Sequence, residues 1–155
     1  MNTKLSAILL AGLGLASQIP SYACTGITLK SKDGATIAAR TIEWAESVMN
    51  TMYVVVPRNE ELQSFTPSGI DGVMFKAKHG YVGLAVEQKE FMVEGINEKG
   101  LSAGLFYFPN YGKYESYEAS LKDKCLADFQ VVSYVLAECS TTDEVKEALS
   151  KVRII

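Results

Sequence analysis

The sequence contains no hydrophobic run long enough to span a membrane and no run of basic residues. Its main apolar stretch, LSAILLAGLGLA at residues 5–16, is shorter than the roughly 18 residues that a spanning helix needs. The formal net charge is −3, and an acidic chain without basic runs argues against nucleic acid or an anionic membrane surface as a partner. Internal repeats, low-complexity tracts and linkers are also absent. Hydrophobic residues make up 48% of the chain, which predicts a globular domain with one core.

Histidine and cysteine are scarce. The one histidine, His79, lies in the loop-like stretch KAKHGY and is interpreted as an ordinary surface residue. Among the three cysteines, Cys125 and Cys139 fall in what the pattern predicts to be one continuous helix. At about 1.5 Å per residue they would be about 21 Å apart, far beyond the roughly 7 Å that a disulfide spans. We therefore expect both to be buried apolar side chains, and Cys24 to be unpaired.

The first 23 residues have the pattern of a secretory signal peptide. Lys4 supplies the positive start, the apolar stretch follows, Pro20 breaks the helix, and Ser21-Tyr22-Ala23 offers small residues at the −3 and −1 cleavage sites. Signal peptidase is thus an expected partner, and residues 24–155 would form the exported domain, in the periplasm or outside the cell. A lipoprotein is the alternative, although Ser21 and Tyr22 are not the residues that lipidation normally requires.

The rest of the chain predicts several strands followed by a helix pair. Asp33-Gly34 suits a tight hairpin turn. NEKG at 97–100 contains Asn and Gly, which are typical of a turn between two strands. The predicted strands are 25–31, 35–44, 51–57, 81–86, 90–96 and 101–107, with loops at 58–72 and 108–118. Apolar spacings of three and four predict a helix over 121–139, and Ser140 or Thr141 with Glu144 predicts a capping box opening a second helix. This order indicates an α+β fold.

Cleavage before Cys24 would create a residue that carries a thiol and a free α-amine on the same Cα. An α-amine titrates near pH 7.7–8.0 and a thiol near 8.5. Around neutral pH the neutral amine can therefore accept the thiol proton, so that base and nucleophile belong to one residue. Such a site needs no separate histidine.

Three ordered segments make the resemblance to a family specific. CTGITLKSKDG at residues 24–34 is followed by Arg40 sixteen residues after the cysteine and by an acid three residues further on. INEKGLSAGLFYFPNY (96–111) and VLAECSTTDEVKEAL (135–149) follow in order. Together they resemble the choloylglycine hydrolase (linear amide C–N hydrolase) family, which includes bile salt hydrolases and penicillin V acylases. The resemblance implies an N-terminal-nucleophile hydrolase with a four-layer αββα fold, which needs no metal or cofactor.

The resemblance also implies four site residues. Cys24 matches the nucleophile, and Arg40 matches the arginine whose charge favours the thiolate. Glu43 lies where many members have an aspartate that orients the amine; its extra methylene shifts the carboxylate by about an ångström, enough to affect proton transfer. Tyr107 lies where penicillin V acylases can have Tyr and bile salt hydrolases have Asn, and its backbone N–H would donate to the oxyanion. The alternatives are a solvated Arg40 and Glu43 and a packed Tyr107, while Asn97 is interpreted as a turn residue.

The expected activity is hydrolysis of an N-acyl amide, with conjugated bile acids, penicillin V or a related amide as substrate. The family's remaining oxyanion-hole Asn and second Arg come from later in its chain, and the apolar ending Ile154-Ile155 predicts an incomplete domain of N-terminal strands plus a helix pair. Two alternatives stay open: a non-catalytic exported or lipid-anchored binding module, and an inactive fragment of such an amidase. The sequence also leaves the oligomeric state open, a homo-oligomer included.

Overall fold

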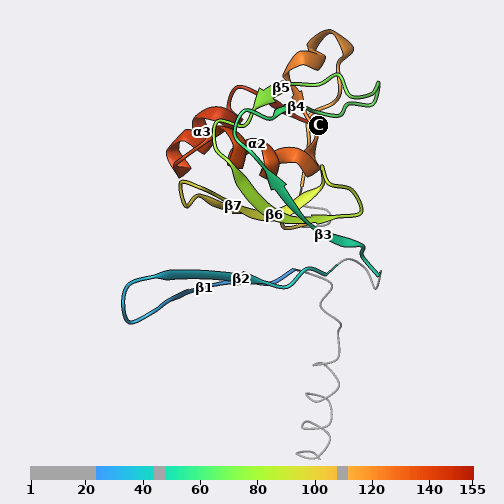
Figure 1. Ribbon diagram of the computed structural model, residues 1–155. Coiled ribbons are helices and arrows are strands. Elements are labelled where there is room, and N and C mark those ends of the chain that lie inside the picture. Colours follow the sequence, from blue (N-terminus) through green and yellow to red (C-terminus); the bar gives the residue numbers. More distant parts are fainter. Residues whose placement is uncertain (1–23, 44–47, 108–111) are drawn as a thin grey trace, which may run out of the picture. The chain divides into compact units, whose positions relative to one another are not determined.

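A computed structural model describes residues 24–43, 48–107 and 112–155 (Figure 1). The predicted signal peptide, the loop residues 108–111 and Trp44 lie outside these described residues. The chain divides into two compact units, Met1–Glu46 and Ser47–Ile155. Within the described residues the first unit is a β-hairpin, and the second is a sheet packed against helices.

The hairpin of the first unit pairs β1 (Gly26–Lys30) with antiparallel β2 (Thr36–Arg40). Its turn is closed by the Ser31 N–H, which donates to the Ala35 carbonyl at 2.9 Å, and by the Gly34 N–H, which donates to the Ser31 carbonyl at 3.0 Å. Gly34 has φ +88°, a conformation that glycine adopts without the steric cost of a side chain. The hairpin turn predicted at Asp33-Gly34 is confirmed.

One face of this hairpin is apolar. Ile27, Leu29 and Ile37 lie on it because strand residues alternate between faces and Leu29 is directly opposite Ile37. These side chains are 53%, 56% and 52% exposed. Burial within the hairpin therefore contributes little to its stability, and a two-stranded hairpin alone is marginal in water.

The second unit is built on a four-stranded antiparallel sheet in the order β3-β6-β7-β8. Its strands are β3 (Thr51–Val56), β6 (Tyr81–Val86), β7 (Met92–Asn97) and β8 (Ser102–Gly104). Gly83 and Gly95 are opposite each other in β6 and β7. A Cβ on Gly95 would lie 2.8 Å from Leu136 of the helix above the sheet. Gly95 thus lets that helix approach the sheet closely.

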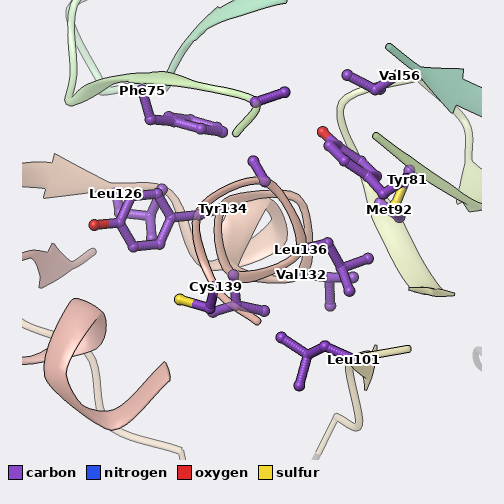
Figure 2. Packing of buried hydrophobic residues seen from close by; sticks show 13 residues of the cluster. Val56, Phe75, Tyr81, Met92, Leu101, Leu126, Val132, Tyr134, Leu136 and Cys139 are labelled. Atoms are coloured by element: carbon purple, nitrogen blue, oxygen red, sulfur yellow. The ribbon is translucent and has the colours of Figure 1, made fainter. Parts of the chain in front are cut away.

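That helix, α2 (Val131–Glu138), provides the centre of the core. Figure 2 views it end-on, with side chains from the sheet and from Phe75 arranged around it. Leu136 and Met92 are fully buried, and the Phe75 ring meets the Tyr134 ring edge-on at 5.3 Å between centroids. The helix thus covers one face of the sheet. Tyr53 and Val55, on the opposite face, are exposed.

Short elements complete the second unit. Thr141 caps α3 (Thr142–Leu149), and its side chain accepts from the Glu144 N–H at 3.2 Å. The Glu144 carboxylate accepts from the Ser140 N–H at 2.6 Å. The predicted cap is therefore confirmed, with the return bond made one residue before the cap. The remaining elements are β4 (Glu61–Gln63), β5 (Met74–Lys76), η1 (Ala119–Lys124), β9 (Cys125–Leu126), η2 (Asp128–Gln130), α3 (Thr142–Leu149) and β10 (Arg153–Ile154).

Three predictions about elements were wrong. The predicted loop 58–72 contains β4, which pairs with the unpredicted β5. The predicted strand 101–107 ends at Gly104. The continuous helix predicted over 121–139 is broken, and only Val131–Glu138 is α-helical.

Hydrogen bonds to distant parts of the chain explain why the predicted helix does not form over its whole length. The backbone of Cys125 and Leu126 pairs in parallel with β10, and the Cys125 carbonyl accepts from the Val73 N–H at 2.9 Å. The apolar spacing here reflects burial by separate neighbours, for instance the Phe129 ring against Phe65 and Phe91. Cys125 and Cys139 are nevertheless free and buried, as expected.

Candidate active site

The hairpin unit contains three of the four residues expected at the site, namely Cys24, Arg40 and Glu43. Pairing between its strands continues beyond β1 and β2, because the Thr41 N–H donates to the Thr25 carbonyl at 2.9 Å. The Thr25 N–H donates in turn to the Thr41 hydroxyl at 3.0 Å. The chain next to Cys24 is thus held against the segment that follows Arg40.

Cys24 is half-buried and unpaired. Its Sγ lies 3.6 Å from the backbone carbonyl of Glu43, within reach of a weak S–H donor bond. The side chain of Cys24 and the backbone of Glu43 therefore lie together at the open end of the hairpin. Glu43 itself is exposed.

Arg40 is the last residue of β2 and is directly opposite Gly26. Gly26 has no side chain, so β1 presents none beside that of Arg40. Arg40 is half-buried, and its Nε donates to the Thr41 carbonyl at 3.2 Å. Arg40 therefore contributes a positive charge at the end of the hairpin that also carries Cys24.

Tyr107, the fourth expected residue, belongs to the second unit. It follows β8, and its side chain is 53% exposed. The expected backbone donor to an oxyanion thus lies just beyond a strand end in the part of the chain that carries the core.

Asn97 has the structural role expected of it. It is buried, and its Oδ1 accepts from the N–H groups of Lys99 and Leu101 at 3.0 and 3.1 Å. Its Nδ2 donates to the carbonyls of Leu136 and Cys139 at 3.0 and 2.7 Å. One side chain thus organises the β7–β8 turn and satisfies carbonyls at the end of α2 that would otherwise lack helical partners.

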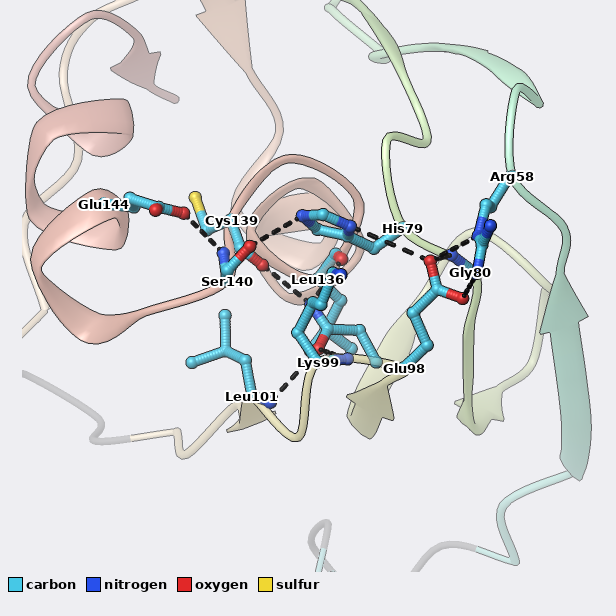
Figure 3. A network of polar contacts seen from close by, with 11 residues as sticks. Arg58, His79, Gly80, Glu98, Lys99, Leu101, Leu136, Cys139, Ser140 and Glu144 are labelled. Carbon is cyan, nitrogen blue, oxygen red and sulfur yellow. Dashed lines mark hydrogen bonds and ion pairs between the residues drawn. The ribbon is translucent and has the colours of Figure 1, made fainter.

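His79 is not the ordinary surface residue that was expected. Its Nε2 is 2.8 Å from the Ser140 hydroxyl, and its backbone N–H donates to the Ala137 carbonyl at 3.2 Å. Its Nδ1 lies 3.8 Å from a carboxylate oxygen of Glu98 (Figure 3). No local pattern indicates this contact, because 61 residues separate His79 from Ser140.

Glu98 links this network to the β3–β4 turn. Arg58 Nε donates to one carboxylate oxygen at 2.6 Å, and Arg58 Nη2 donates to the other at 2.5 Å. The Gly80 N–H also donates to Glu98, at 3.2 Å. The Arg58 guanidinium is the main cause that lowers the pKa of Glu98. These contacts join turns that are distant in the sequence, so we interpret the role of the network as structural.

Two further sequence-based expectations concern metals and membranes. Across residues 24–43, 48–107 and 112–155, no group of three or more His, Cys, Asp and Glu side chains is arranged to hold a metal ion. In the same described ranges, no helix is both long and apolar enough for a membrane crossing.

Similarity to known proteins covers the chain from Cys24 onward. The model of the choloylglycine hydrolase family, described as linear amide C–N hydrolases, matches residues 24–155. A bile salt hydrolase/transferase of Clostridium perfringens (strain 13 / Type A) is 29% identical over 132 residues, covering 85% of this chain and 39% of the relative. A bile salt hydrolase/transferase of Bifidobacterium longum subsp. longum is 27% identical over 135 residues, covering 85% and 40%.

The chain spans about two-fifths of the length of the curated relatives it matches. Its mixture of small sheets and few helices agrees with the expected α+β fold, as an incomplete N-terminal-nucleophile hydrolase domain. The family match over residues 24–155 establishes that the chain belongs to the choloylglycine hydrolase family of linear amide C–N hydrolases.

Proposed function

We propose that this protein is an exported amidase that hydrolyses linear amide bonds of N-acyl substrates, with Cys24 as an N-terminal nucleophile. The observation that carries the proposal is the position of Cys24. It is the first residue of the family match, it directly follows a signal-peptide pattern, and it lies at the same end of the hairpin as Arg40. Removal of residues 1–23 by signal peptidase would free its α-amine in the periplasm or outside the cell.

In the proposed mechanism the neutral α-amine of Cys24 accepts the thiol proton. The thiolate attacks the amide carbonyl carbon and forms a C–S bond, and the carbonyl electron pair moves onto oxygen. Arg40 favours the thiolate through its positive charge. The backbone N–H of Tyr107 is the proposed donor to the resulting oxyanion.

Collapse of this intermediate breaks the C–N bond. The α-ammonium of Cys24 returns its proton to the departing amine, which leaves as the neutral product. Water then attacks the acyl-thioester, with the same α-amine as base, and releases the acid and the thiol. Glu43 is the proposed group that orients the amine, although its side chain is one methylene longer than the aspartate of many family members.

For the substrate, we propose an amide whose acyl part is large and apolar. The named relatives are bile salt hydrolase/transferases, which favours conjugated bile acids. Tyr107 favours penicillin V through the family resemblance. Hydrolysis of glycine- and taurine-conjugated bile acids and of penicillin V, measured side by side, ranks these classes.

The test is Cys24→Ser in the processed protein, with N-terminal sequencing of both proteins. Removing a nucleophile that acts together with its base costs about 10³-fold or more in turnover, so hydrolysis should fall to near background. Thr28→Ser, an exposed change on β1, is the matched control and should retain activity. Retained turnover in Cys24→Ser, or a mature chain that starts at another residue, would remove this mechanism.

A further inference from the structure

We infer that Thr41 is a positioning residue for the N-terminal nucleophile, acting as a side-chain clamp on the residue that follows Cys24. The inference rests on the proposed function, because it concerns the geometry of the same thiol and amine. It assigns a role to a residue whose type and place, a threonine after a strand, do not suggest one.

Thr41 binds both backbone polar groups of Thr25. Its hydroxyl accepts from the Thr25 N–H at 3.0 Å, and its own N–H donates to the Thr25 carbonyl at 2.9 Å. These two bonds lie beyond the last paired residues of the strands, Gly26 and Arg40. They hold the two hairpin segments together at the residue next to Cys24.

A clamp is needed here because the first residue of a chain is normally poorly ordered unless it is tied down. After processing, the Thr25 N–H would be the first backbone amide in the protein. The thiol and the amine of Cys24 both extend from one Cα, so freedom at this amide moves base and nucleophile together relative to substrate. A displacement of about 1 Å at a reacting group can cost about 100-fold in rate.

The hydroxyl is the part of Thr41 that performs this role. Replacement of Thr41 by valine keeps the branched shape and the main-chain bond to the Thr25 carbonyl, and removes only the acceptor. Serine keeps the acceptor and loses a methyl group. This pair of substitutions therefore separates hydrogen bonding from packing, a distinction that a single alanine substitution does not make.

The experiment compares Thr41→Val, Thr41→Ser and the control Thr36→Val in the processed full chain. Thr36 is an exposed threonine at the far end of β2, opposite Lys30. Three quantities are measured: hydrogen exchange of the Thr25 amide, the pH profile of Cys24 alkylation by iodoacetamide, and kcat and KM for amide hydrolysis.

For Thr41→Val we expect Thr25 exchange to accelerate about five- to tenfold, as for loss of one hydrogen bond. We expect kcat to fall about 10- to 100-fold with KM nearly unchanged, and the pH profile of alkylation to shift. Thr41→Ser should restore all three quantities to within about threefold, and Thr36→Val should leave them unchanged.

Two results would overturn the clamp. One is wild-type kcat and alkylation in Thr41→Val while Cys24→Ser is inactive, which leaves the proposed function standing. The other is an equal loss in Thr41→Val and Thr36→Val, which assigns the effect to hairpin stability in general. An active Cys24→Ser variant instead removes the proposed function. If Thr41→Val does not fold, Thr41→Ser decides through Thr25 exchange, since slow exchange requires a hydroxyl acceptor at this position.

Discussion

The two units of this protein differ in how their residues are held, and the expected chemistry falls mainly on the less buried one. In the hairpin, every residue of β1 is exposed, and order depends on main-chain pairing, the Gly34 turn and the Thr25–Thr41 contacts. In the second unit, α2 and the sheet enclose fully buried side chains such as Leu136. Functional segments commonly come from the parts of a protein with low local stability.

The largest expected effect comes from removing the same side chain in the two units. Leu136→Ala should lower the free energy of unfolding by about 2–5 kcal/mol, because Leu136 is fully buried against the sheet. Leu29→Ala should change it by less than about 0.5 kcal/mol, because Leu29 is 56% exposed. Urea denaturation followed by circular dichroism measures both. A comparable loss in Leu29→Ala would mean that the apolar face of the hairpin is covered in solution, and would contradict the comparison.

The sequence predicted elements well where one local signal was sufficient. The strand-like runs at Thr51–Val56 and Tyr81–Val86 and the Asp33-Gly34 turn each predicted an element that the structure contains. The helix prediction over 121–139 failed because the backbone of Cys125 and Leu126 forms hydrogen bonds with strand β10 instead of helical hydrogen bonds. Such a choice depends on tertiary contacts, which override local spacing.

The candidate site was predictable to a different degree. Cys24 and Arg40 were proposed as site residues from their spacing and from the family resemblance, and their roles stay predictions. The Thr41 hydroxyl was not identified, because a threonine just after a strand is common and only the three-dimensional structure shows which group donates to it. His79 was misjudged for the same reason, since its partners Ser140 and Glu98 come from distant turns.

The smallest expected effect is acid loosening of one turn in each unit. Hydrogen bonds from the Ser31 hydroxyl and the Ala35 N–H lower the pKa of Asp33 below its usual 3.8. The hydrogen bonds from Arg58 lower the pKa of Glu98 below its usual 4.5. Because each folded-state pKa is lowered, each carboxylate stabilises its turn above these usual values. That contribution is lost as the pH falls through the lowered value.

Carboxyl NMR titration with Asp33→Asn and Glu98→Gln measures this loss. Each substitution should flatten the pH dependence of its own turn below about pH 4.5, where carboxyl groups begin to take up protons, and leave the other turn unchanged. Coupled changes in both turns would contradict two independently held units.

Thiol labelling tests the central claim most directly, namely that Cys24 is the reactive N-terminal nucleophile and the other cysteines belong to the core. The native processed protein is treated with iodoacetamide and mapped by mass spectrometry. We predict rapid labelling of a peptide that begins at Cys24 with a free α-amine. Cys125 and Cys139 should react only after denaturation, since both are buried and burial raises the pKa of Cys139. A Cys24 that is blocked, preceded by uncleaved residues, or no more reactive than the buried pair would contradict the account.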